Sequence, residues 1–186
     1  MQISTILFDL GSTLVYSKDP WPPIYEQADR ALANELYRAG IAINPDSFQK
    51  ELGGFIRSYY DNPSKGNLEP TAYVALRDML SRKGLDNIPE KILRTALEAL
   101  YSVTQRNWYL EEDARQTLEM LISHGYRLGL VSNTSDDRNV QGIVDRLGLR
   151  TFFESIVTSA ALGIRKPDQR IFQVALDHFL IDARAA

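Results

Sequence analysis

Short apolar runs that stop abruptly at polar residues recur along this chain. The first run covers Ile3 to Phe8, contains β-branched residues and stops at Asp9. A second run covers Tyr126 to Val131, and apolar residues at 152–157 lead toward a third. Because continuous apolar runs of this length are typical of strands buried on both faces, the chain is predicted to contain a parallel sheet.

The stretches between these runs carry apolar residues at helical spacing. One helix is predicted at about 111–124 and another at about 140–147. Asp168 is placed to cap a last helix, which would bury Ile171 and Phe179 among other residues. The alternation of strand and helix is typical of an α/β fold with a Rossmann-like parallel sheet and right-handed crossovers.

A long helical stretch interrupts this alternation directly after the first strand. Four apolar stripes between Ile24 and Trp108 predict four helices with short connections, which is typical of a small helical bundle. Three prolines within residues 16–23 predict a linker that leads into the bundle, because proline cannot continue a strand or a helix interior. Asp46 or Ser47 is expected to cap the second helix.

These patterns predict two domains and one clear loop. We expect residues 1–15 and 110–186 to form the α/β core, and residues 16–109 to form an inserted helical cap. Asparagine, proline, serine and glycine at 62–67 predict a loop inside the insertion.

The composition limits the classes of function. The 186 residues carry a net charge of −3, which gives no reason to expect nucleic acid or an anionic membrane as a partner. The chain has no cysteine, which excludes disulfides, zinc–thiolate sites and thiol nucleophiles. Residues 1–4 do not resemble a signal peptide and no apolar run is long enough to span a bilayer, so a cytoplasmic protein is expected. The sequence leaves the oligomeric state open.

Polar side chains follow all three predicted strands. Because the carboxyl ends of parallel strands meet at one edge of a sheet, Asp9, Ser132 and Lys166 are expected to lie near one another. An aspartate can attack phosphorus or carbon and form a covalent intermediate. Ser132 offers a hydroxyl donor with Asn133 beside it, and Lys166 offers a cation for an anionic substrate. These groups could converge on a phosphoryl group, although Asp9 could instead cap the turn that Gly11 indicates.

Three segments resemble the motifs of the haloacid dehalogenase-like (HAD) hydrolase superfamily. They are Phe8–Leu14 (FDLGSTL), Gly125–Asn133 (GYRLGLVSN) and Gly163–Phe172 (GIRKPDQRIF). The helical insertion is similar to the cap that one large subgroup carries between its first and second motifs. The resemblance covers nearly the whole chain.

The resemblance implies a Mg²⁺-dependent phosphatase that acts on a small phosphorylated metabolite through an aspartyl-phosphate. It implies that Asp9 is the nucleophile, that Ser132 binds a phosphoryl oxygen, and that Lys166 steadies Asp9 and the substrate. Gly11 and Asn133 would contribute to substrate binding. Mg²⁺ would be bound by the Asp9 carboxylate and the backbone carbonyl of Gly11.

Two departures from the family pattern bear on the reaction. Many phosphatases of this superfamily have a second aspartate two residues after the nucleophile, which protonates the leaving group; this chain has Gly11 there. That keeps open the chemistry of a 2-haloacid dehalogenase, because halide leaves without a proton. The fourth motif, which supplies a further Mg²⁺ ligand, is not found, and Asp182 lies too early to replace it. A truncated or non-catalytic protein, with the first strand at an exposed edge of the sheet, is therefore a further alternative.

Overall fold

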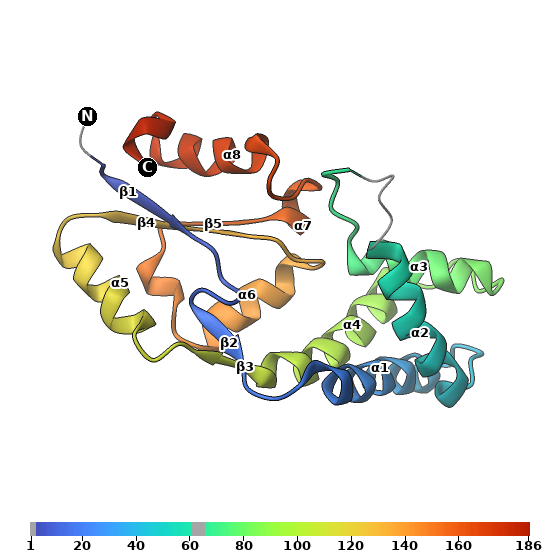
Figure 1. The fold of residues 1–186 in the computed structure, drawn as a ribbon. Coiled ribbons are helices and arrows are strands. Elements are labelled where there is room, and N and C mark those ends of the chain that lie inside the picture. The colour runs from blue at the N-terminus through green and yellow to red at the C-terminus, as the bar shows by residue number, and fades with distance from the viewer. Residues whose placement is uncertain (1–2, 61–65) are drawn as a thin grey trace. The chain divides into compact units, whose positions relative to one another are not determined.

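The computed structural model describes residues 3–60 and 66–186, and the chain divides into two compact units (Figure 1). The α/β unit comprises Met1–Ser17, Asn67–Glu69 and Trp108–Ala186, and the helical unit comprises Lys18–Gly66 and Pro70–Asn107. The loop predicted at 62–67 lies mostly outside the described residues. Three residues in the middle of the insertion, 67–69, thus belong to the α/β unit.

The α/β unit contains a parallel sheet, which confirms the predicted α/β class. Its strands are β1 (Thr5–Phe8), β4 (Arg127–Ser132) and β5 (Ser155–Thr158), in the order β1–β4–β5. Phe8 pairs with Leu130, and Ser132 pairs with Thr158. All three strands therefore end at the same edge, and β1 pairs with β4 alone among the described strands.

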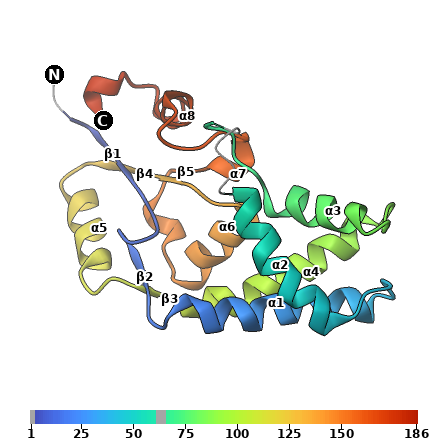
Figure 2. The same cartoon turned by 45° about the vertical axis from the view of Figure 1, so that its right-hand side comes forward.

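Helices cover both faces of this sheet because side chains along β4 alternate between them. Leu128 and Leu130 pack in one cluster with residues of α5 (Ala114–Ser123) and α6 (Asp137–Arg146). Val131 packs on the other face against α8 (Gln169–Phe179). Figures 1 and 2 both show α8 on one side of the strands, with α5 and α6 on the other.

A two-stranded antiparallel sheet, which the sequence did not predict, overlaps the predicted linker at residues 16–17. It consists of β2 (Val15–Ser17) and β3 (Trp108–Leu110). The linker prediction was also wrong at its other end, because helix α1 already begins at Trp21. Pro22 and Pro23 lie in the first turn of α1, where backbone N–H groups have no helical acceptor to lose.

The helical unit contains the four predicted helices, which surround one apolar core. They are α1 (Trp21–Arg38), α2 (Pro45–Tyr60), α3 (Ala72–Arg82) and α4 (Glu90–Thr104). Leu32, Leu76 and Leu97 are among its fully or nearly fully buried side chains. The cap predicted for α2 was wrong: the Asn44 side chain accepts the Ser47 N–H at 3.0 Å, so the capping residue lies before the proline that opens the helix.

Short helical segments complete the described chain. They are η2 (Gln105–Asn107), η3 (Arg150–Phe152), α7 (Ser159–Leu162) and η4 (Ala183–Ala185). Among the described residues, every helix is too short or too polar to cross a lipid bilayer.

Candidate active site

Asp9 follows directly on the last residue of β1 and faces the cation of Lys166. The Lys166 Nζ lies 2.9 Å from Asp9 Oδ1 and donates a hydrogen bond to the Val131 carbonyl at 2.9 Å. The Asp9 side chain is 43% exposed and that of Lys166 is 20% exposed, so solvent and solutes can reach the pair. The same Asp9 oxygen accepts the Leu10 N–H at 2.8 Å. The local contact proposed as an alternative role for Asp9 therefore coexists with the ion pair.

A turn follows Asp9, as the sequence predicted. Its left-handed residue is Ser12, with a φ of 57°, and not Gly11. The turn is closed by the Ser12 N–H, which donates to the Val15 carbonyl at 2.7 Å. Gly11 therefore needs no special backbone freedom. A Cβ added there would meet only Trp108 Cη2, at 3.7 Å, which is an ordinary van der Waals contact.

Ser132 and Asn133 lie at the end of β4, beside the end of β1. Ser132 is 4% exposed. The Asn133 amide binds the backbone of Lys166 twice: its Oδ1 accepts the Lys166 N–H at 2.8 Å, and its Nδ2 donates to the Lys166 carbonyl at 3.2 Å. This pair of bonds fixes the Lys166 loop to the end of β4. The structure thus links Lys166 directly to Asp9 and to Asn133. Ser132 lies between Val131 and Asn133, and Lys166 contacts both of these neighbours.

The donors around Asp9 fit Mg²⁺ only as a one-carboxylate site. Among residues 3–60 and 66–186, no group of three or more histidine, aspartate or glutamate side chains could hold a metal ion. Mg²⁺ is commonly held through one or two carboxylates together with substrate phosphate and water. Asp9 and the Gly11 carbonyl could supply such a partial set, which a phosphorylated substrate would complete.

A buried carboxylate that the sequence did not reveal lies near these loops. Glu69 Oε2 accepts a hydrogen bond from Ser159 Oγ at 2.7 Å and lies 3.7 Å from Arg165 Nε. Burial raises the pKa of Glu69, while Ser159 and Arg165 oppose the rise. No periodic or motif signal marks Glu69, because its partners are about ninety residues away in the chain.

Asp168, two residues after Lys166, caps α8 as predicted. Its carboxylate accepts the Arg170 N–H at 3.0 Å and pairs with the Arg170 guanidinium at 2.8 Å. The side-chain bond from Arg170, followed by the backbone bond, lowers the pKa of Asp168 to about 2. Asp168 therefore stays ionised across the physiological pH range.

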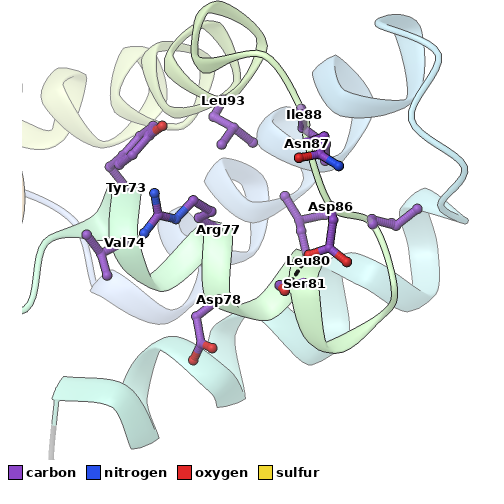
Figure 3. Close-up of a pocket in the computed structure, with 11 residues that line it drawn as sticks. Tyr73, Val74, Arg77, Asp78, Leu80, Ser81, Asp86, Asn87, Ile88 and Leu93 are labelled. Atoms are coloured by element: carbon purple, nitrogen blue, oxygen red, sulfur yellow. Dashed lines mark hydrogen bonds between the residues drawn. The ribbon is translucent and has the colours of Figure 1, made fainter.

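A cavity of about 720 Å³ lies in the helical unit, between α3 and the start of α4. Figure 3 shows Arg77, Asp86 and Asn87 among its lining residues, with Ser81 bonded to Asp86. None of the site residues predicted from the sequence lines this cavity. The reactive groups named above all belong to the α/β unit.

Comparison with known proteins identifies the family of this chain. A model of the haloacid dehalogenase-like hydrolase family matches residues 3–186. Human haloacid dehalogenase-like hydrolase domain-containing protein 3 is 45% identical over 185 residues, which cover 95% of this chain and 69% of the relative. The glyceraldehyde 3-phosphate phosphatase of Pyrococcus abyssi is 31% identical over 186 residues, covering 99% of this chain and 71% of the relative. The crystal structure of a 2-haloacid dehalogenase from Pseudomonas syringae has a TM-score of 0.67 at 24% identity, and covers 100% of this chain and 76% of that chain.

Proposed function

Because this chain belongs to the haloacid dehalogenase-like hydrolases, we propose that it is a Mg²⁺-dependent phosphatase that acts on a small phosphorylated metabolite through an aspartyl-phosphate on Asp9. The observation that carries the proposal is the Asp9–Lys166 pair, 2.9 Å apart and open to solvent at the strand ends. A relative named glyceraldehyde 3-phosphate phosphatase supports a three-carbon sugar phosphate as the first substrate to test.

Each site residue has a distinct role in the proposed reaction. An Asp9 oxygen attacks phosphorus, and the bond from phosphorus to the substrate oxygen breaks. That oxygen leaves as an alkoxide and takes a proton from water. A second water then cleaves the aspartyl-phosphate, which releases inorganic phosphate and restores Asp9. The Lys166 ammonium orients the Asp9 carboxylate and offsets the charge of the phosphoryl oxygens. Ser132 donates a hydrogen bond to one of those oxygens, and Asn133 holds the Lys166 backbone. Mg²⁺, when bound by Asp9 and the Gly11 carbonyl, would neutralise phosphate charge.

We also propose that the insertion at 16–109 serves as a cap that selects the substrate. The family resemblance supports this role, and the helical unit supplies a folded body of its own. Substitutions of exposed residues in this unit are then expected to change KM between substrates more than they change kcat with p-nitrophenyl phosphate.

The proposal is tested by hydrolysis of p-nitrophenyl phosphate and glyceraldehyde 3-phosphate, with Mg²⁺ and with EDTA. Asp9→Asn keeps the shape of the side chain and removes the nucleophile, so kcat should fall at least about 10³-fold. Asp145→Asn, which removes an exposed carboxylate of α6 from its pair with Arg150, serves as the matched control. Turnover that survives Asp9→Asn would refute the proposal.

One observation favours a second candidate, a 2-haloacid dehalogenase. Gly11 has no proton to donate, and halide departure from carbon needs none. The discriminating result is halide release from a 2-haloacid in EDTA, lost in Asp9→Asn, from a protein that leaves both phosphate esters intact.

A further inference from the structure

Three residues of the insertion, 67–69, pair with the backbone of the loop that contains Lys166. The Glu69 N–H donates to the Gly163 carbonyl at 2.9 Å, and the Arg165 N–H donates to the Asn67 carbonyl at 2.9 Å. Leu68 and Ile164 form an antiparallel bridge between these two bonds. Figures 1 and 2 both show the segment that leads into α3 running beside α7. Residues 67–69 thus form a short ladder with the backbone of residues 163–165, and this ladder ends one residue before Lys166.

The Glu69 side chain is also connected, through Ser159, to the loop that follows β4. Its carboxylate is 3% exposed and accepts the Ser159 hydroxyl at 2.7 Å. Ser159 Oγ in turn accepts the Thr134 N–H at 2.8 Å. The Ser159 hydroxyl has one proton. Its oxygen lies 3.1 Å from the Thr134 carbonyl and 2.7 Å from the Glu69 carboxylate, so the proton is directed toward Glu69. Glu69 thereby fixes the orientation of Ser159, which holds Thr134.

Both chains of contact end at the immediate sequence neighbour of a site residue. Thr134 follows Asn133, whose amide makes two hydrogen bonds to the Lys166 backbone. The ladder formed by residues 67–69 holds the same loop from its other side, up to Arg165. A buried carboxylate is costly unless it is hydrogen-bonded and paired, and here one carboxylate contacts Arg165 of one loop directly and reaches the other loop through Ser159. A leucine in its place could fill the space, yet it could not hold Ser159 or Arg165.

We propose that Glu69 is a positioning residue for the hydrolytic reaction: through Ser159 and Arg165 it holds the Ser132–Thr134 and Gly163–Lys166 loops in register. This inference rests on the proposed function, because it assigns these loops to the phosphoryl site. It gives the insertion a role in catalysis besides substrate selection. Glu69 itself touches neither substrate nor Asp9.

The test compares three variants in the full chain with p-nitrophenyl phosphate. Glu69→Ala should lower kcat by about 10- to 100-fold, because small displacements of catalytic groups are costly. It should also raise KM about threefold or more, a change that a smaller folded fraction cannot produce. Glu69→Gln keeps an acceptor for Ser159 and should recover most of kcat. The control Glu154→Ala breaks the Arg127–Glu154 ion pair, at the start of β4, and should leave both constants unchanged.

A double mutant tests the path through Ser159. Ser159→Ala should resemble Glu69→Ala, and the double variant should lose no more than the worse single variant, since both remove the same link. The inference is overturned if Glu69→Ala keeps KM and loses kcat only in proportion to the folded fraction measured by circular dichroism. It is also overturned if the two losses multiply.

The inference can be tested even if the wild-type chain turns over neither phosphate ester, a result that would refute the proposed function alone. Amide hydrogen exchange by NMR then replaces turnover. The Thr134 and Lys166 amides donate to Ser159 and Asn133, so their exchange should speed up about tenfold or more in Glu69→Ala and not in Glu154→Ala. Unchanged exchange at both amides would overturn the role of Glu69.

Discussion

The two units of this molecule bury different kinds of side chain. Among the described residues, six buried polar or charged residues belong to the α/β unit and three to the helical unit. Those of the α/β unit are Thr5, Glu69, Ser132, Asp136, Thr158 and Ser159; those of the helical unit are Gln49, Thr104 and Asn107. Four of the six lie at or just after the carboxyl ends of β4 and β5.

This contrast indicates where the fold accepts an energetic cost. A buried polar group destabilises unless its hydrogen bonds are satisfied, so such groups persist where they fix a geometry. In the α/β unit four of them lie at or just after the ends of β4 and β5, at the edge of the sheet where Asp9 follows β1. The helical unit instead buries mainly leucine and alanine and carries its ion pairs at the surface. We therefore expect substitutions of the polar groups near Asp9 and Lys166 to change the reaction, and substitutions in the apolar core of the helical unit to change stability.

The largest effect is expected from Lys166→Met. The variant keeps much of the side-chain volume but loses the cation beside Asp9 and the bond to Val131, so kcat should fall about 10²–10³-fold. Lys83→Met, which breaks the exposed pair with Glu51 in the helical unit, is the matched control and should keep wild-type kcat. Steady-state kinetics on both variants makes the comparison, and equal losses would remove the distinction between the units.

Leu97→Ala should give the reverse result. Leu97 is 2% exposed in the core of the helical unit, and its truncation should lower the free energy of unfolding by about 2–5 kcal/mol. Activity per folded molecule should not change. Each unit has one tryptophan, Trp21 and Trp108, so urea unfolding can be followed by fluorescence in Trp108→Phe and Trp21→Phe backgrounds. A loss of kcat without a loss of stability would contradict the division.

The sequence predicted the regular parts of both units well, because repeated apolar spacing reports on long elements. The four helices of the insertion and the strands ending at Phe8 and Val131 were found this way. The β2–β3 sheet was missed because each strand has three residues, too few to show alternation. The prolines predict a linker, although the positions of Pro22 and Pro23 in the first turn of α1 leave its hydrogen bonds intact.

The candidate site was predictable to the extent that it depends on strand ends. Parallel strands bring their carboxyl ends together, which is why Asp9 and Lys166 were expected to meet. Asn133 was expected to bind substrate, yet its amide is bonded to the Lys166 backbone. Contacts of this kind, like that of Glu69 with Ser159, join residues far apart in the chain and leave no periodic trace. The predicted roles of Asp9, Ser132 and Lys166 toward substrate, and of Asp9 and Gly11 toward Mg²⁺, remain predictions.

Substitutions of two glycines, one in each unit, should change the free energy of unfolding by intermediate amounts and in opposite directions. A Cβ at Gly129 in β4 would lie 2.7 Å from Leu7 Cδ2 and 2.8 Å from Phe179 Cε2, so Gly129→Ala should destabilise by about 1–3 kcal/mol. Gly54 lies within helix α2 with no heavy atom within 4 Å of an added Cβ, so Gly54→Ala should stabilise by about 0.5–1 kcal/mol. Urea unfolding of both variants checks the opposite signs, and matching signs would contradict the packing described for β4.

Gly11→Asp is expected to raise activity. The Cβ fits against Trp108, and the new carboxylic acid could protonate a leaving alcohol. We expect an increase of about tenfold in kcat for glyceraldehyde 3-phosphate and a smaller one for p-nitrophenyl phosphate, whose leaving group needs little protonation. Gly11→Asn, similar in shape but unable to donate an acidic proton, is the control. An equal gain in the asparagine variant would show that the acid is not the cause.

The smallest effect is expected from Asp168→Asn, and its sign depends on pH. Because the folded-state pKa of Asp168 lies near 2, below the ordinary value of 3.8, its ionised form favours the folded state. That stabilisation is complete above about pH 4 and is lost as the pH falls toward 2. The melting temperature of Asp168→Asn should therefore lie slightly below wild type at pH 7, and the gap should close in acid. Asp78→Asn breaks an exposed aspartate–arginine pair of similar length in α3, but no helix-capping bond is lost with it, so its gap at pH 7 should be smaller. If the difference in melting temperature between Asp168→Asn and wild type instead widened as the pH fell, the ionised Asp168 would oppose folding. Burial has that effect at Glu69, because it raises the pKa of that carboxyl.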